Sequence, residues 1–253
     1  MRRISDPSRY AESAAIVLSH VTKRFVLRHT HSMKETFVAW TRHKPIADSF
    51  LALDDVSFTI ERGESVALLG LNGSGKSTSL KLVSGVLVPD GGEALTRGRV
   101  AGLIEVGAGF HPDLSGRENV FLNAAILGMS QAETEQRFDD IVEFSGIARF
   151  IDTEVKHYSS GMFVRLAFAV AIHTEMDTLL VDEVLSVGDE PFQQKCILRI
   201  KELNEQGKTL VVVSHDLNTV QEICRRGVVM QSGKVIFDGP IGEAVATLRA
   251  SAT

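Results

Sequence analysis

Short apolar runs alternate with helical patterns along most of the chain. The runs at Ser65–Leu69, Thr178–Val181 and Thr209–Ser214 lack the polar alternation of a half-exposed strand. Uniformly apolar strands are typical of a parallel sheet that is covered on both faces. Helical patterns surround these runs, at Ser77–Leu87, Gly161–His173 and Glu190–Gln206. The alternation predicts an α/β fold with a mostly parallel core sheet.

Other stretches depart from this alternation. Ile16–Phe25 and Ala52–Ile60 alternate in polarity, which predicts an antiparallel β subdomain. Gly227–Asp238 contains two apolar runs separated by Ser232-Gly233, as in a hairpin with a two-residue turn. The stretch from about His111 to Ser160 carries mostly helical patterns and predicts a separate helical lobe.

Composition and charge narrow the class of protein. The chain has 253 residues, 44% of them hydrophobic and 23% charged, as in an ordinary globular protein. Its net charge of −5 argues against a general nucleic-acid binder, so no nucleic-acid partner is expected. The cysteines, Cys196 and Cys224, match no metal or disulfide spacing and are expected to be reduced.

No stretch of the sequence predicts a membrane-spanning helix. The longest run without Asp, Glu, Lys or Arg is Asn119–Ala132, which has 14 residues. A spanning helix needs about 20 mostly apolar residues. The charged residues near the N-terminus also argue against a signal peptide. Any membrane role is therefore expected to depend on a partner.

A glycine-rich segment follows the first apolar run and precedes a helix. It fits the pattern G-x-x-x-x-G-K-[ST], whose backbone N–H groups cradle phosphates. Lys76 is expected to hold the β- and γ-phosphates, and the Ser77 hydroxyl to bind Mg²⁺. The alternative is a simple glycine turn between a strand and a helix. The expected nucleotide-binding residues are Gly70, Leu71, Asn72, Gly73, Ser74, Gly75, Lys76, Ser77 and Thr78.

Two further apolar runs end in residues with candidate chemistry. Asp182 and Glu183 follow one run, and His215 follows another. In a parallel sheet such residues face the ligand crevice at the carboxyl edge. Asp182 is placed to bind Mg²⁺ and Glu183 to orient or deprotonate the attacking water. The alternatives are two solvated acids and a structural histidine.

The order of the remaining motifs identifies a family. Tyr158-Ser159-Ser160-Gly161-Met162 opens an apolar helix, with serine where an N-cap belongs. This helix precedes the strand that ends in Asp182-Glu183, and Ser186-Val187-Gly188-Asp189 follows that strand. In this order, over about Ile16–Gly239, the sequence resembles the ATP-binding-cassette (ABC) ATPases. The resemblance implies a P-loop NTPase fold of the ABC type, with ATP and Mg²⁺ as its ligands.

The resemblance also implies a role for each motif. Gly70–Thr78 corresponds to the Walker A loop. Asp182 corresponds to the Walker B acid, and Glu183 to the catalytic glutamate. Ser186 and Asp189 belong to the D-loop, and His215 is the switch histidine. Two subunits are then expected to pair head to tail, so that one subunit's signature motif meets the γ-phosphate held by the other. The signature residues are Ser159, Ser160, Gly161 and Met162.

The sequence departs from the family pattern at two functional positions. Glu105 stands where the family has a glutamine that touches Mg²⁺, and its carboxylate can still bind the ion. Phe25 is the candidate for the aromatic residue that stacks on adenine, because stacking uses the ring face. A core position for Phe25 is the alternative. His31–Lys44 adds an amphipathic pattern, which predicts either a helix packed on the domain or a docking helix for a membrane partner.

The chain resembles one subgroup of the ABC ATPases in particular. Gly102–Met129, Tyr158–Met162 and Val181–Asp189 resemble the ATPase subunits of bacterial polysaccharide exporters, which move O-antigen, capsule or teichoic-acid chains through a separate permease. An ATP-hydrolysing motor at the cytoplasmic face of the inner membrane is therefore expected. The carbohydrate-binding domain that some members carry is not expected after Thr253. Alternatives are an ABC ATPase for lipid or drug, a soluble ABC ATPase acting on ribosomes or DNA, and a non-ABC phosphotransferase.

The same resemblance predicts the domain organisation. Residues 1–253 are expected to form a single ABC ATPase domain. Residues 16–107 and 174–240 would make the nucleotide-binding core with its antiparallel part. Residues 108–173 would make the helical subdomain with the signature motif, and residues 241–253 a C-terminal tail.

Overall fold

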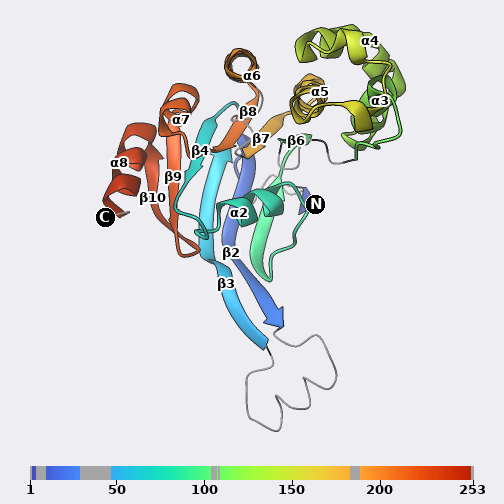
Figure 1. Cartoon of the computed structure of the whole chain (residues 1–253). Coiled ribbons are helices and arrows are strands. Elements are labelled where there is room, and N and C mark those ends of the chain that lie inside the picture. Colours follow the sequence, from blue (N-terminus) through green and yellow to red (C-terminus); the bar gives the residue numbers. More distant parts are fainter. Residues whose placement is uncertain are drawn as a thin grey trace, which may run out of the picture.

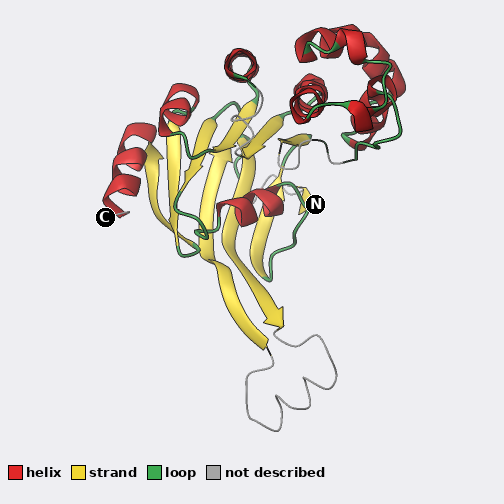
Figure 2. Cartoon of the chain, viewed as in Figure 1, coloured by secondary structure: helices red, strands yellow, loops and turns green. Residues whose placement is uncertain are grey.

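A six-stranded sheet forms the centre of the molecule (Figures 1 and 2). The computed structural model describes residues 2–3, 10–28, 47–103, 107, 109–182 and 189–251. The sheet order is β10-β9-β4-β8-β7-β6, and only β10 runs antiparallel to its neighbour. Its strands are β4 (Ser65–Leu69), β6 (Val100–Leu103), β7 (Thr178–Asp182), β8 (Thr209–Val213), β9 (Arg226–Gln231) and β10 (Lys234–Pro240).

Apolar side chains leave the central strands on both faces. In β4, Val66 and Leu68 point into one buried cluster, whereas Ala67 and Leu69 point into another. Because successive side chains of a strand alternate between faces, such a strand must be apolar throughout. The prediction of a parallel sheet covered on both faces is therefore confirmed.

Helices cover one face of this sheet, and a helix with a second sheet covers the other. The helices that contribute to the first buried cluster are α5 (Ser160–His173), α6 (Glu190–Glu205), α7 (Leu217–Ile223) and α8 (Ile241–Ser251). On the opposite face, α2 (Lys76–Val83) contributes Leu80, Leu82 and Val83 to the second cluster. The central sheet is thus the middle layer of the molecule.

The second sheet contains the two runs that were predicted to be antiparallel. Its order is β1-β5-β2-β3, and β2 pairs antiparallel with both β3 and β5. Its strands are β1 (Arg2–Arg3), β2 (Ala14–Arg28), β3 (Ala47–Glu61) and β5 (Gly91–Thr96). The β2–β3 ribbon extends beyond the rest of the sheet (Figure 1). The prediction is confirmed, although both strands are longer than the polarity pattern indicated.

A hairpin joins β9 to β10, as predicted. Ser232 and Gly233 both have positive φ values, 48° and 78°. Two consecutive left-handed residues are what a type I′ turn requires, and this turn matches the twist of the flanking strands.

The middle of the chain forms a helical lobe at one end of the molecule (Figure 1). It comprises α3 (Gly116–Ile126), α4 (Gln131–Ser145) and two short 3₁₀ turns, Ala148–Phe150 and Val155–His157, packed with α5 around their own apolar cluster. Ser115 and Glu118 form a capping box at the start of α3. Ser130 and Glu133 do the same for α4, so each helix begins where S-x-x-E stands in the sequence.

Several elements differ from the sequence-based expectations. The helix predicted over Ser77–Leu87 ends at Val83, because Gly85 adopts a left-handed φ of 79° that stops it. Strands β5 and β6 and helix α7 had not been predicted. The segment 241–253, expected only as a tail, contains helix α8, whose Ala244 and Val245 are buried. The amphipathic segment His31–Lys44 lies outside the described residues.

Two smaller expectations concern thiols and membrane helices. Cys196 and Cys224 are free and buried, and burial raises the pKa of both thiols to about 12. Such thiols are protonated at neutral pH and unreactive. Among the described residues, no helix combines the length and the apolarity needed to cross a bilayer.

Candidate functional site

The glycine-rich loop lies between the end of β4 and the start of α2. Gly70 has no room for a side chain, since a Cβ there would lie 2.3 Å from the Met230 carbonyl oxygen and 2.5 Å from Ser74 Oγ. Gly75 has a φ of 109°, and a Cβ would lie 2.7 Å from Leu53 Cδ2. These contacts explain why glycine stands at both ends of the loop.

The loop is fixed by its neighbours on the second sheet and on the hairpin. The Gly233 N–H of the β9–β10 turn donates to the Ser74 carbonyl oxygen at 3.0 Å. The Gly233 carbonyl oxygen in turn accepts from the Asp54 N–H of β3 at 2.9 Å. The antiparallel sheet, the hairpin and the loop therefore form one hydrogen-bonded unit, which preorganises the loop before any ligand binds.

Lys76 places a positive charge inside the loop. The residue is only 6% exposed, and its Nζ donates to the carbonyl oxygens of Gly70 at 2.8 Å and Leu71 at 3.0 Å. The N-terminus of α2 begins at the same residue, and its free N–H groups also favour an anion. Leu71, Asn72 and Gly73 are exposed, so the loop opens to solvent. The arrangement suits a phosphate chain.

Other predicted residues lie at the same edge of the central sheet. Asp182 ends β7, and His215 follows β8 and is exposed. Strands β7, β8 and β4 are consecutive and parallel, so their carboxyl ends meet at the edge from which the loop emerges. Helix α2 also contacts β7. The Ser77 hydroxyl and the Asp182 carboxylate are oxygen donors, the ligand type that Mg²⁺ prefers. Glu183, Glu105 and Ser186 lie outside the described residues.

The predicted signature motif forms the exposed N-terminus of α5. Ser159 is the N-cap, and its Oγ accepts the Met162 N–H at 3.2 Å. Ser159 and Ser160 are exposed, and Gly161 and Met162 are half-buried. The second half of α5, from Leu166 onward, is buried in the core. The helix is therefore firmly held at one end and presents the other end to solvent.

Phe25 lies outside the apolar clusters and is half-buried. One side of its ring stacks on Phe50 across the β2–β3 ribbon, with centroids 5.6 Å apart and planes 24° apart. Lys23, two residues earlier, pairs with Leu53, the residue that packs beside Gly75. Phe25 thus lies roughly 7 Å further along the strand than the loop contact, since a strand rises about 3.4 Å per residue. The core alternative for Phe25 is wrong.

Sequence reasoning missed two residues that shape this region. Arg165 of α5 forms an ion pair with Asp189, the N-cap of α6, at 2.5 Å, and its guanidinium lies over the Phe192 ring. Asn119, fully buried in α3, holds the loop before that helix through four hydrogen bonds. Its Nδ2 donates to the carbonyl oxygens of His111, Leu114 and Ser115, and its Oδ1 accepts the His111 N–H. The only sign of Asn119 in the sequence was an asparagine at a position whose pattern indicates burial, within Gly116–Val120.

Asp189→Asn is expected to lower the melting temperature by about 1–4 °C at pH 7, because Asn retains the helix cap but loses the charge that pairs with Arg165. Burial opposes ionisation of Asp189, but hydrogen bonds from Arg165 and the Phe192 N–H outweigh it and lower the pKa of Asp189 from its ordinary value. A lowered folded-state pKa stabilises the protein above the unfolded-state value and is lost as pH falls through the folded value. The difference between the two proteins should therefore be present at pH 7 and shrink below pH 4. Thermal unfolding followed by circular dichroism measures it, and an undiminished difference at pH 3 would exclude the charge as its cause.

Comparison with known proteins shows to which family the chain belongs. The ABC transporter family model matches residues 53–186, more than half of the chain. The chain belongs to the ABC transporter family. The matched range of this ABC protein runs from β3 through the loop, the helical lobe and α5 to the segment after β7.

Curated relatives are similar over most of the chain. The O-antigen export system ATP-binding protein RfbB of Klebsiella pneumoniae is 47% identical over 83% of this chain and 87% of its own length. The ABC transporter protein AbcA of Aeromonas salmonicida is 50% identical over 79% of this chain, and the match covers 66% of AbcA. The teichoic acids export ATP-binding protein TagH of Listeria innocua is 41% identical over 87% of this chain and 65% of its own length. The matches to AbcA and TagH thus cover slightly less than two thirds of those proteins.

Solved structures share the fold. A dimeric ATP-binding cassette in a post-hydrolysis state, bound to ADP and Pi, matches with a TM-score of 0.71 at 24% identity, over 89% of this chain and 98% of that one. An ATP-binding subunit of an ABC transporter matches with a TM-score of 0.73 at 23% identity, over 93% and 94% of the two chains. The predicted P-loop fold of the ABC ATPase type is confirmed.

Proposed function

We propose that this ABC protein is the ATP-hydrolysing subunit of a bacterial exporter that moves a polysaccharide through a separate membrane permease. The observation that carries the ATPase part is the preorganised loop, with the buried Lys76 ammonium at the N-terminus of α2. The cargo part rests on the similarity to the ATP-binding proteins of O-antigen and teichoic-acid export.

Within one subunit, the proposed ATPase residues lie in the glycine-rich loop, in β2 and after the ends of two central strands. The loop N–H groups and Lys76 bind the phosphate chain of ATP and neutralise its charge. Phe25 offers a ring face to the adenine. Glu183 accepts a proton from the water that attacks the γ-phosphate, and His215 orients that water or senses the phosphate. Burial of Lys76 and the fixed loop geometry favour this chemistry, since preorganised charges need no rearrangement in the transition state.

The oxygen donors at the same edge fit a divalent cation. Ser77 and Asp182 would hold Mg²⁺, with Glu105 as a further ligand. When bound, the ion neutralises charge on the β- and γ-phosphates. The protein's own contribution would be to hold the Asp182 carboxylate at the end of β7 and the Ser77 hydroxyl at the start of α2, beside the glycine-rich loop.

The exposed N-terminus of α5 supports a head-to-tail dimer. Ser159, Ser160, Gly161 and Met162 are proposed to contact the γ-phosphate bound by the opposite subunit, and Ser186 and Asp189 to lie along the same interface. A helix N-terminus binds an anion through its free N–H groups. ATP then joins the two subunits, and hydrolysis separates them. In this proposal the chain is one ATPase domain, with the core at 16–107 and 174–240 and the helical subdomain at 108–173.

The permease partner places the protein at the cytoplasmic face of the inner membrane. Affinity purification of the tagged protein from detergent-solubilised native membranes, with mass spectrometry, tests this proposal. A multi-spanning permease together with glycan-assembly enzymes is expected, and untagged membranes provide the control. Recovery of ribosomal or DNA-repair proteins without a membrane protein would overturn the export function while leaving the ATPase proposal intact.

A further inference from the structure

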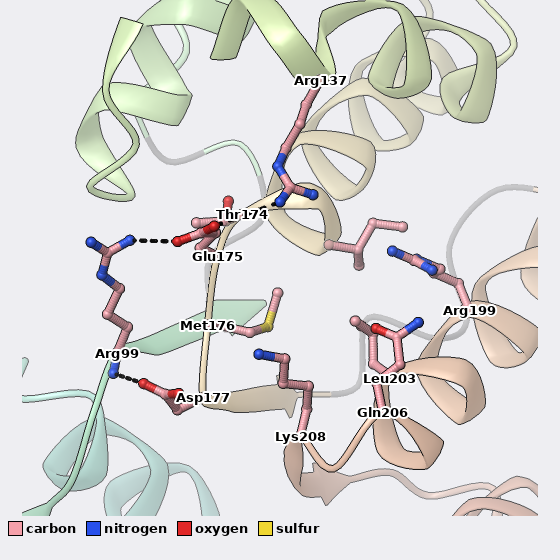
Figure 3. Close-up of a pocket in the computed structure, with 11 residues that line it drawn as sticks. Arg99, Arg137, Thr174, Glu175, Met176, Asp177, Arg199, Leu203, Gln206 and Lys208 are labelled. Atoms are coloured by element: carbon pink, nitrogen blue, oxygen red, sulfur yellow. Dashed lines mark hydrogen bonds and ion pairs between the residues drawn. The ribbon is translucent and has the colours of Figure 1, made fainter. Parts of the chain in front are cut away.

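A cavity lies at the amino-terminal ends of β6, β7 and β8, and Figure 3 shows the side chains that line it. It has a volume of about 410 Å³ and is lined by residues that immediately precede β6, β7 and β8, together with residues of α4 and α6. The loop instead follows the carboxyl end of β4, which runs parallel to β8. The two regions are therefore separated by the length of the strands. Four cationic side chains line the cavity, Arg99, Arg137, Arg199 and Lys208, against two carboxylates, Glu175 and Asp177.

Both carboxylates already have partners. Glu175 lies between two arginines, with Oε2 at 3.3 Å from Arg99 Nη1 and Oε1 at 3.8 Å from Arg137 Nη2. Asp177 Oδ2 accepts the backbone N–H of Arg99 at 2.7 Å. Neither carboxylate pairs with Arg199 or Lys208, and Arg199 forms its ion pair with Glu202 instead.

Arg199 and Lys208 project toward the middle of the cavity (Figure 3). Arg199 Nη1 donates to Glu202 at 2.9 Å, but its Nε is buried and has no hydrogen-bond partner in the described structure. The ammonium of Lys208 forms no hydrogen bond or ion pair with any residue that the structure describes. A buried donor without a partner, such as Arg199 Nε, is costly, and an anion placed between Arg199 and Lys208 would accept hydrogen bonds from both.

A second hollow of about 220 Å³ shares Asp177 and Lys208 with the first and adds two arginines, Arg62 and Arg97. The Nε and Nη2 atoms of Arg97 are buried, again without a partner within the described ranges. Positive charge thus continues beyond the first cavity, although the whole protein has a net charge of −5.

A neighbouring histidine lies close enough to two of these arginines for their charges to affect its pKa. His173, buried at the end of α5, has a lowered pKa. Burial is the main cause of the lowered pKa, and the charges of Arg199 and Arg137 lower it further. The hydrogen bond that His173 Nδ1 donates to the Ala169 carbonyl oxygen and the charge of Asp140 act in the opposite direction.

We propose that this cavity binds a small anion that carries two or more phosphate groups. Arginine and lysine in a recess are the groups that recognise phosphate, and guanidinium N–H groups bind its oxygens in pairs. The volume exceeds that of a single inorganic ion and lies in the range of small-molecule sites. The proposal does not depend on the proposed export function, because none of these residues belongs to the nucleotide site.

Titration of inorganic pyrophosphate into the full-length protein, followed by calorimetry without Mg²⁺, tests the proposal. The Lys76→Ala protein is used in parallel, because it weakens binding at the glycine-rich loop. We expect pyrophosphate binding to persist in Lys76→Ala and to weaken at least about tenfold when Arg199→Gln and Lys208→Gln are combined in that protein. Uridine diphosphate in a second titration distinguishes the source of the phosphates. Tighter binding would indicate an organic diphosphate, and equal binding would indicate recognition of the phosphates alone.

A matched control removes two cations that lie elsewhere, both of them lysines. Lys201→Gln with Lys234→Gln makes the same change in net charge, but these side chains pair with Glu222 and Asp54, away from the cavity. Binding should be unchanged in this control. Should the Arg199 variant fail to fold, Lys208→Gln alone should still weaken binding several-fold. The proposal is overturned if pyrophosphate does not bind to Lys76→Ala, or if the control weakens binding as much as the cavity variants.

Discussion

Lys76→Ala is expected to weaken ATP binding by about 100-fold or more. The ammonium is buried inside the loop and is the cation positioned to meet the phosphate chain. Charge-assisted contacts in a preorganised, partly dry site are worth far more than those at the surface. Equilibrium binding of a fluorescent ATP analogue measures the change directly, without requiring turnover.

Lys81→Ala is the matched control for this variant. Lys81 lies in the last turn of the same helix α2, so its removal alters the helix but not the loop. Its affinity for the analogue should stay within about threefold of the original, since a cation in the last helical turn contributes little at a distance. Thermal unfolding of both variants shows whether α2 is still packed. Near-normal binding by a folded Lys76→Ala protein would refute the phosphate-binding role of the lysine.

The central strands were predicted well from the sequence because their buried environment restricts which residue types can occupy them. Ser65–Leu69 and Thr209–Val213 are buried on both faces, so every position must be apolar or small. Strands β5 and β6 were missed for the converse reason. Gly91–Thr96 is mostly half-buried and contains two glycines, and its pairing with β2 depends on residues far away in the chain. Long-range pairing leaves no local signal in such a strand.

In the candidate site, too, local features could be predicted from the sequence and long-range ones could not. The loop around Lys76 could be predicted because the glycines that its backbone conformation requires lie within eight consecutive residues. The Arg165–Asp189 pair and the cavity with Arg199 and Lys208 could not, since each joins segments whose side chains meet only after folding. An arginine on a helix is usually a solvated residue, and only its buried, unsatisfied Nε marks Arg199 as different.

Glu183→Gln is expected to reduce ATP hydrolysis by about 10²–10⁴-fold while leaving ATP binding within about threefold. Glutamine has nearly the same shape as glutamate but cannot accept the proton of the attacking water, and general-base catalysis contributes a factor of this size. The change leaves in place Lys76, the proposed phosphate ligand, and Ser77, the proposed Mg²⁺ ligand. Phosphate release at saturating ATP measures hydrolysis, and the fluorescent analogue measures binding.

The same variant should accumulate as a nucleotide-bound dimer, because ATP can join two subunits but hydrolysis no longer separates them. Size-exclusion chromatography with light scattering should therefore show a dimer in the presence of ATP and a monomer after its removal. Glu190→Gln removes an equal charge from the exposed first turn of α6 and serves as the control, with normal turnover. Lys76→Ala combined with Glu183→Gln should abolish the dimer, since the nucleotide that joins the subunits would be missing. If Glu183→Gln hydrolyses ATP at a rate near that of Glu190→Gln, the base is another residue; if it is inactive but remains monomeric with ATP bound, the head-to-tail arrangement is wrong.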